Sequence, residues 1–506
     1  MHTIELLLVL LAVTAGLEVL ARALRLPLPV LLVAAGLTVA LLPRVPRPEL
    51  DPDAVFLVFI PPLLYWTAIT SSIRDFQRYL ASITLLAVGL VLVTTAAVAA
   101  VAHALIPELT WPAAFVLGAI VSPPDPVAAI AVTRHLSIPR PMITILEGEG
   151  LVNDATALVA YKMSVAAVVS GAFSLRDASL NFLKAGLGGI AIGLAVGFVI
   201  ALVRRRIKKA PTVEATISLL TPFLAFIPAD RLGWSGVLSV VAVGLYLGHL
   251  GPRIVSAQSR LQAAYMWRMV TFLLEGLIFL LVGLQLPRAF ENLGNHTTFE
   301  LLGYAVLVSG AAIAVRILWM YPGAFLARLI RHPFKGWQAM PRWQEAIFMG
   351  WAGIRGGDSL VIALSLPFVT SANEPFPGRP MIIFLTFVII VVTLVVIGLS
   401  LAPLARWLAL KDGGELEREE AEARKRLLAA VHATLSATPS GAGGFVRTAL
   451  SVVEAQREAL IQMRDTCAIG GEVMQKLQHE LDLEEVLLES RPTGPKPVSP
   501  PPGPQL

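Results

Sequence analysis

The stretch from position 111 to position 133 reads WPAAFVLGAIVSPPDPVAAIAVT and decides the fold. It is long and apolar enough to cross a hydrocarbon layer about 30 Å thick as a helix. Near its middle, however, Pro123, Pro124 and Pro126 each remove a backbone donor from that helix. Asp125 lies among them, at a depth where charge is expensive. Broken backbone at membrane depth is tolerated only where protein or a watery cavity surrounds it, so this stretch predicts an interior, functional segment of a membrane protein.

The composition of the whole chain agrees with a membrane protein. Of its 506 residues, 56% are hydrophobic and 15% are charged, and the mean hydropathy is +0.73. Soluble domains carry about a quarter charged residues, so nearly all soluble enzyme classes are excluded. Basic runs with interleaved aromatics are missing, which argues against a nucleic-acid partner. The single cysteine, Cys467, cannot form an intrachain disulfide.

Charged residues and Pro/Gly-rich punctuation divide the chain into thirteen candidate membrane spans, which predicts an all-α polytopic protein. The first could instead be a signal peptide, because residues 21–23 mimic a cleavage site, but its front end lacks the positive charges of one. The predicted spans are 3–21, 27–43, 53–70, 80–105, 111–133, 141–170, 179–203, 212–229, 234–250, 264–287, 300–327, 343–369 and 379–409.

The basic residues predict the orientation. Seventeen Lys and Arg residues fall in the odd-numbered connections between spans and six in the even-numbered ones. Because cytosolic loops carry the excess of Lys and Arg, the N-terminus is predicted outside and the C-terminus in the cytosol. By composition, residues 1–410 form the membrane domain, 411–490 a cytosolic helical tail, and 491–506 a Pro-rich end that is predicted to be disordered.

Four charges stand near the centres of their spans. Asp125 and Asp154 lie in spans five and six, and Arg316 and Arg355 in spans eleven and twelve. Span twelve is also interrupted there, by the glycines of GIRGGDS at 353–359. If span seven is a linker, the two breaks occupy the fifth span of each half, and the halves have inverted topology. Paired broken helices in inverted repeats indicate the binding site of a secondary transporter.

Three motifs at these positions resemble the monovalent cation:proton antiporter-1 family, the sodium/proton exchangers. They are GAIVSPPDPVA at 118–128, EGLVND at 149–154 and GIRG at 353–356, which runs on into SL at 359–360 and ALSLP at 363–367. Weaker similarity covers 235–246, 283–287 and the tail from 456 to 489. The resemblance spans the whole membrane part. It implies two inverted repeats, broken helices that cross in a core domain, and a dimerisation domain, and hence a homodimer.

The resemblance also implies roles for individual residues. Asp154 would bind either Na⁺ or a proton, Asn153 would support that site, and Asp125 would line it or hold the neighbouring backbone. Glu149 would pair with Arg316 as a structural ion bridge, and Arg355 would offset charge where the helices cross. The sequence departs from the family pattern at three places, which are Pro124 in place of a common Thr, Trp66 in place of a common acid, and Asp358 in place of an apolar residue.

These residues predict a mechanism without a cofactor or enzymatic chemistry. Burial favours the neutral form of a carboxyl group, and either a proton or a cation can supply that neutralisation. Competition for Asp154 would then couple one Na⁺ or Li⁺ to one proton and serve pH homeostasis at a bacterial cell membrane. Potassium/proton exchange by the same machinery is the nearest alternative. A passive channel and an intramembrane aspartyl protease are more distant ones, and the protease signature Gly-x-Gly-Asp is missing at 355–358.

Overall fold

The computed structural model describes most of the chain, in two compact units. Residues 127–128 and 131–133 of predicted span five, and the Pro-rich end 491–506, lie outside the described residues. Unit 1 comprises Met1–Ile200, Leu219–Gly248 and Trp267–Gly413, and unit 2 comprises Ala201–Ser218, His249–Met266 and Gly414–Leu506. The described residues are 2–24, 27–42, 52–126, 129–130, 138–171, 175–207, 210–291, 293, 296–335, 341–410, 414–437, 445–466 and 468–490.

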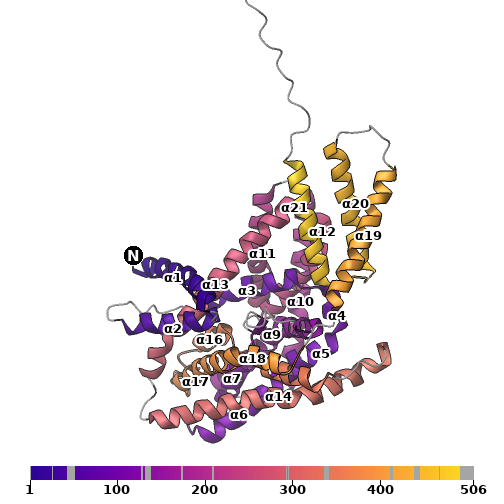
Figure 1. Ribbon diagram of the computed structural model, residues 1–506. Coiled ribbons are helices and arrows are strands. Elements are labelled where there is room, and N and C mark those ends of the chain that lie inside the picture. The colour runs from indigo at the N-terminus through magenta and orange to yellow at the C-terminus, as the bar shows by residue number, and fades with distance from the viewer. Residues whose placement is uncertain are drawn as a thin grey trace, which may run out of the picture. The chain divides into compact units, whose positions relative to one another are not determined.

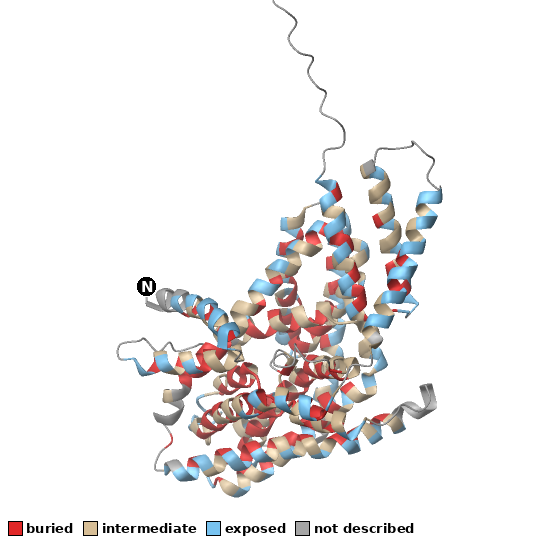
Figure 2. Ribbon diagram, viewed as in Figure 1, coloured by how far each residue is buried: buried red, intermediate tan, exposed pale blue. Residues whose placement is uncertain are grey.

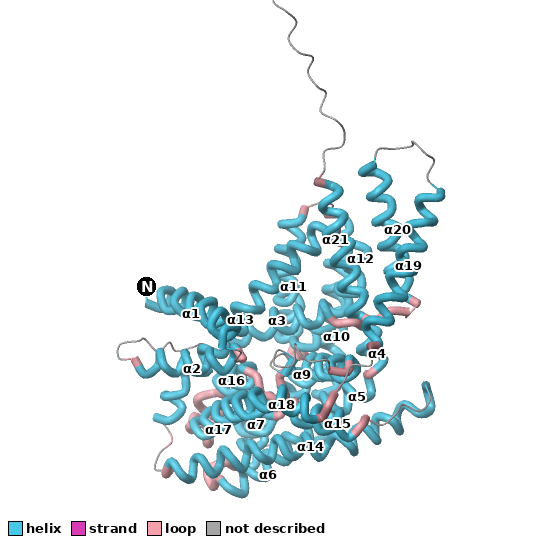
Figure 3. The backbone as a smooth tube through the Cα atoms, viewed as in Figure 1, coloured by secondary structure: helices cyan, strands magenta, loops and turns pink. Residues whose placement is uncertain are grey.

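The regular elements of the described residues are helices, which confirms the predicted all-α class (Figure 3). Every predicted span contains helix. The elements up to the end of predicted span seven are α1 (His2–Leu24), α2 (Leu28–Leu41), α3 (Pro52–Thr70), α4 (Ile73–Arg78), α5 (Leu80–Thr84), the π-helical η1 (Leu85–Leu90), α6 (Val91–Leu105), α7 (Trp111–Val121), α9 (Arg140–Ser170) and α10 (Leu175–Arg206).

The second half of the chain continues in the same way. Its elements are α11 (Pro211–Arg231), α12 (Gly236–Ile254), α13 (Ala257–Glu291), α14 (Thr298–Lys335), α15 (Trp343–Trp351), α16 (Gly357–Leu364), α17 (Arg379–Val392), η2 (Thr393–Ile397) and α18 (Gly398–Trp407). Within the described residues, eight helices are long and apolar enough to cross a membrane. The total of thirteen crossings and their orientation stay predictions.

Unit 1 is one compact unit, in which α3 also packs against α16 and α9. We refer to two sets of its helices as the core group and the scaffold group. The core group contains α5, η1, α6, α7, α9 and α14–α18, and α6 lies beside both α7 and α14 (Figure 1). Most residues of α7, α16 and α17 are buried (Figure 2). The scaffold group contains α1, α2, α3, α12 and α13, and glycines let its helices cross closely. A Cβ on Gly36 or Gly283 would run into the backbone of the other helix of the α2–α13 pair, and one on Gly248 into that of α3.

Unit 2 holds the tail helices together with the neighbouring ends of α10–α13. The tail forms α19 (Glu415–Ala437), α20 (Phe445–Asp465) and α21 (Gly471–Glu489). Apolar residues of α21 recur every four positions, at Val473, Leu477 and Leu481, and bury one face of the helix against the other two. The tail and the end of α12 are joined by an ion pair within this unit, since Arg253 in the last turn of α12 pairs with Asp465 of α20.

Asp482 of α21 is the most buried acid of this tail contact, at 3% exposure. It accepts hydrogen bonds from Arg260 of α13 (2.8 Å from Nε) and from Arg457 of α20 (3.0 Å). Replacing one partner of a buried ion pair leaves the other charges uncompensated. We therefore expect Asp482→Asn to lower the free energy of unfolding of unit 2 by about 3 kcal/mol. Urea-dependent proteolysis of the tail in the full-length, detergent-solubilised protein measures this.

The control for Asp482 is Glu480→Gln on the same helix. Glu480 pairs with Arg424 at 2.8 Å, but both side chains are nearly half exposed, at 46% and 45%. Exposed pairs contribute about 0–1 kcal/mol, so this variant should resist proteolysis almost as the parent does. Equal sensitivity of the two variants would contradict a specific role for the buried pair.

Candidate functional site

The first broken helix is interrupted at the predicted place. α7 begins after Thr110 with a proline in its first turn, where a missing N–H costs nothing, and it ends at Val121. The next residues, Ser122 to Asp125, are not helical, because Pro123 and Pro124 cannot donate the hydrogen bonds that would continue the helix. The freed backbone is satisfied across the break: the N–H of Asp125 donates to the carbonyl of Ile354, at 2.7 Å. That carbonyl lies in the second broken helix.

The second break separates α15, which ends at Trp351, from α16, which begins at Gly357. Its glycines are required by close contacts rather than by unusual backbone angles. A Cβ on Gly356 would lie 2.7 Å from a carboxylate oxygen of Asp125, and one on Gly357 would collide with Ile278 of α13. The missing side chains let the two breaks cross, and they place Asp125 directly against the start of α16.

Asn153 and Asp154 lie in the middle of α9, next to this crossing. The amide nitrogen of Asn153 donates to the carbonyl of Pro124 at 2.9 Å, so Asn153 satisfies backbone that the first break leaves free. Its amide oxygen is buried without a partner. Asp154 is half-buried, and within the described residues it has no ion pair or hydrogen bond. Its neighbours include two like charges, Asp358 and Asp125, which repel it.

Glu149, about one turn before Asn153 on α9, forms a buried ion pair with Arg316 of α14. The two distances are 2.5 and 2.9 Å, and each side chain is 1% exposed. Arg316 also donates to the carbonyl of Met349 on α15, at 3.2 Å. The pair therefore joins three helices of the core group, and it satisfies Arg316, one of the four charges that the sequence places near the centre of a span.

Arg355 lies inside the second break and is 2% exposed. Its backbone N–H donates to the hydroxyl of Thr393 at 3.0 Å, and its guanidinium donates to the carbonyl of Gly353 at 3.3 Å. The C-terminal ends of α7 and α15 lie at the two breaks. A buried cation is favourable beside such ends, because they carry partial negative charge.

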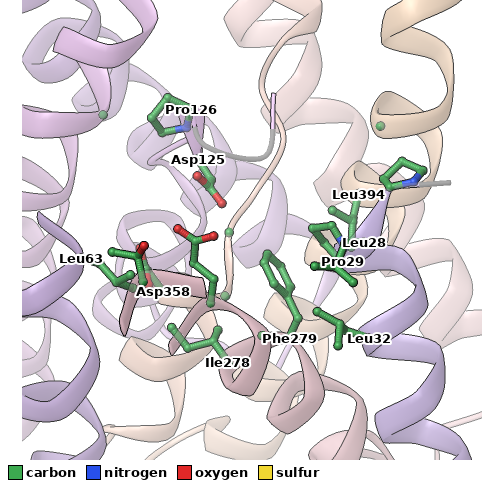
Figure 4. Close-up of a pocket in the computed structure, with 18 of the residues that line it drawn as sticks. Leu28, Pro29, Leu32, Leu63, Asp125, Pro126, Ile278, Phe279, Asp358 and Leu394 are labelled. Carbon is green, nitrogen blue, oxygen red and sulfur yellow. The ribbon is translucent and has the colours of Figure 1, made fainter. Parts of the chain in front are cut away.

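A cavity of about 1020 Å³ opens beside the crossing, and Asp125, Asp154 and Asp358 line it, whereas Asn153, Glu149, Arg316 and Arg355 do not. Asp125 and Asp358 line it together with Ile278 and Phe279 of α13 (Figure 4). The cavity extends to the ends of α1, α2 and α18, where Arg22, Pro27 and Arg406 line it. Within the described residues, no three acidic, histidine or cysteine side chains converge closely enough to cage a metal ion. A cation bound by two of these carboxylates would need carbonyl or water oxygens as its further ligands.

Two residues of this cavity extend the set that the sequence motifs supply. Glu275 of α13 lines the cavity, and it is not part of any of the three motifs. The sequence does indicate Glu275, because this residue stands at the midpoint of predicted span 264–287. A charge near the centre of a span is the same feature that indicates Asp125 and Asp154. Trp66 also lines the cavity and stacks on Trp267, with ring centroids 6.3 Å apart and planes at 15°.

Comparison with known proteins gives one consistent result. Residues 9–407 match the family described as sodium/hydrogen exchanger, transmembrane. An uncharacterized Na⁺/H⁺ exchanger of Mycobacterium tuberculosis is 35% identical over 94% of both chains. A sodium, potassium, lithium and rubidium/H⁺ antiporter of Bacillus subtilis is 33% identical over 73% of this chain and 56% of its own. The structure of the sodium proton antiporter MjNhaP1 from Methanocaldococcus jannaschii superposes with a TM-score of 0.64, at 19% identity, over 81% of this chain and 99% of that one.

Proposed function

Because the chain belongs to the sodium/hydrogen exchanger family, we propose that it exchanges Na⁺ or Li⁺ for H⁺ across the bacterial cell membrane, in which it is a multi-pass protein. The observation that carries this proposal is the half-buried carboxylate of Asp154. It lines a cavity beside two crossed, broken helices and has no ionic partner among the described side chains. An ionisable group kept without a counter-ion at this depth indicates an ion or proton pathway.

In this mechanism a cation and a proton compete for Asp154. Na⁺ would bind between Asp154 and Asp125, and Asn153 would hold the backbone of the first break in place through the carbonyl of Pro124. Either ligand neutralises Asp154, and the loaded core group can then move against the scaffold group. The empty, ionised site would have to carry an uncompensated charge through the dry barrier, which is costly. One carboxylate per cycle gives an exchange of one cation for one proton.

The direction in which the cavity opens follows from the distribution of basic residues. Arg22 and Arg406 stand at the ends of α1 and α18, on the side with the excess of Lys and Arg. By the positive-inside rule this side faces the cytosol, and the cavity gives water and cations access to Asp154 from there. The state is therefore inward-open. We further propose a homodimer, with residues 1–410 as the exchanger domain, 411–490 as a cytosolic appendage, and pH homeostasis as the role.

The experiment uses purified protein in proteoliposomes with an imposed pH gradient. Na⁺, Li⁺ or K⁺ is added separately, and a pH-sensitive dye reports the gradient. Collapse by Na⁺ and Li⁺ but not by K⁺ is the expected result. Collapse by K⁺ alone would keep the mechanism and change the substrate, an outcome that the Bacillus subtilis relative makes worth testing because its name includes potassium. Clamping the membrane potential tests the stoichiometry, since each net charge moved would feel about 2.3 kcal/mol per 100 mV.

A further inference from the structure

Two Arg-Trp sequences meet in unit 1, where α15 begins and α18 ends. Arg342 and Trp343 stand at the start of α15, and Arg406 and Trp407 close α18. The two indole rings meet edge to face, with centroids 6.4 Å apart and planes at 74°. Such an arrangement is favourable for aromatic rings. The ring pair therefore brings the two arginines, each the direct neighbour of a ring in the chain, to one corner of the unit.

The helices that carry these sequences are also joined at their opposite ends. Trp351 is the last residue of α15, and its indole N–H donates to the hydroxyl of Ser400, near the start of α18, at 2.8 Å. The start of one helix thus lies beside the end of the other, so α15 and α18 pack side by side in opposite directions. A contact at each end of this helix pair holds the corner in place.

The described part of the chain leaves this corner uncovered. Trp343 is 51% exposed and Trp407 is 72% exposed, and both arginines beside them are exposed as well. Among the described residues neither arginine side chain has an ion pair. The carboxylate of Glu345 accepts a hydrogen bond from the backbone N–H of Arg342 at 3.1 Å, so it is engaged at the start of α15. Two positive charges and two large rings are thus presented together at one place.

The corner lies at the boundary of the apolar spans. Trp407 is the last residue of the apolar span Arg379–Trp407, and Trp343 begins predicted span 343–369. The excess of Lys and Arg assigns both of these ends to the cytosolic side. Tryptophan is enriched at this level of a membrane, because its amphipathic ring is stable among lipid headgroups. A lipid headgroup is therefore the partner that reaches the corner.

From this arrangement we propose that the corner binds the headgroup of an anionic phospholipid. The guanidinium groups of Arg342 and Arg406 would donate hydrogen bonds to the phosphate, whose oxygens suit their planar geometry. The two rings would pack against the apolar part of the same lipid. A zwitterionic headgroup also carries a phosphate, but its ammonium group needs a free carboxylate, and Glu345 is already engaged. The two positive charges therefore select a lipid of net negative charge.

The bound lipid would also affect the cavity, because Arg406 lines it. Arg22, the other basic residue that lines the cavity, is paired with Glu18 at 2.7 Å. The positive charge of Arg406 repels a cation that enters, and a bound phosphate cancels this repulsion. This part of the inference rests on the proposed antiport function. It adds that a bound anionic lipid lowers the KM for Na⁺ at the cytosolic face.

The first test measures lipid binding and does not depend on transport. Fluorescent phosphatidylglycerol is titrated into the full-length protein, which has been delipidated in a neutral detergent. Each arginine near the membrane surface contributes about fivefold to the affinity for an anionic lipid, so Arg342→Gln with Arg406→Gln should bind about 25-fold more weakly than the parent. Arg342→Lys with Arg406→Lys keeps both charges and should restore part of the affinity. Unchanged binding by the Gln variant would refute the site.

The matched control is Arg205→Gln with Arg206→Gln. These two arginines are exposed neighbours at the end of α10, in a last turn without tryptophan. The control should bind phosphatidylglycerol as the parent does. Equal weakening by the two pairs of substitutions would show a diffuse attraction to basic residues and would overturn the proposal. Equal affinity of the parent for phosphatidylcholine, or displacement of the lipid by an equal concentration of glycerol 3-phosphate, would overturn it as well.

The second test measures exchange in proteoliposomes of phosphatidylcholine with and without phosphatidylglycerol. The surface potential of the vesicles acts on every variant alike, so a difference between variants isolates the corner. Phosphatidylglycerol should lower the KM for Na⁺ at the cytosolic face about threefold more in the parent than in Arg406→Gln, the weight of one charge several ångströms away in water. An equal lipid effect in both proteins would refute the link to the cavity. If neither protein exchanges cations, the antiport function fails, and the binding test alone decides whether the lipid site exists.

Discussion

Asp154→Asn is expected to reduce cation-dependent proton movement to the rate of protein-free liposomes. Asparagine has nearly the same shape as aspartate, but it can neither release a proton nor balance the charge of a cation. The fold should survive, because Asp154 holds no other side chain in place among the described residues. Proton flux in proteoliposomes, together with thermal unfolding in detergent, separates loss of transport from loss of structure. Glu374→Gln, which removes one carboxylate from an exposed loop outside the cavity, serves as the control.

The same competition predicts how exchange depends on pH. Where protons occupy Asp154 most of the time, each fall of one pH unit should raise the KM for Na⁺ about tenfold, because one cation displaces one proton. The maximal rate at saturating Na⁺ should change much less. A KM that is independent of pH would contradict a shared site, and substantial exchange by Asp154→Asn would place the site elsewhere. Asp154→Glu, which moves the carboxylate by about one bond length, should keep part of the activity.

The sequence predicted the two breaks because their cause is local. Three prolines in one span and a run of glycines in the other disrupt helix hydrogen bonding wherever they occur, and a charge at the centre of an apolar span is visible without a structure. The partner of each charge is not local. Glu149 and Arg316 are 167 positions apart, and only the resemblance to a family suggested that they pair.

Two other features were not predicted from the sequence, for physical reasons. Glu275 met the depth criterion, but it lies in an unbroken helix, so no disrupted backbone drew attention to it. Asp482 of the tail is part of a polar helix, whose charges are normally solvated. Its burial depends on Arg260, a residue in a different part of the sequence. Contacts between distant segments, rather than local propensities, are what the structure adds.

The ion pair of Glu149 and Arg316 carries the largest expected effect on stability. Each charge is almost completely buried, at 1% exposure. Removing one partner leaves the other charged, buried and uncompensated, which costs about 3–5 kcal/mol. Glu149→Gln and Arg316→Met should each lower the Tm of the detergent-solubilised protein markedly. The side chain of Arg316 packs closely against Gly353 and donates to the carbonyl of Met349. The neighbouring residues therefore have little room to rearrange around an unpaired charge.

The double variant distinguishes the role of this pair in the fold from any role in transport. Replacing both charges removes the attraction and also the need to bury an unpaired charge, so Glu149→Gln with Arg316→Met should recover much of the lost stability. Additive losses would contradict mutual compensation as the reason for the pair. The pair anchors the helix that carries Asp154 to α14 and α15, next to the second break. If the double variant regains both its Tm and its exchange, the pair acts by holding that helix in position; if it regains its Tm alone, the charges themselves take part in moving the ion.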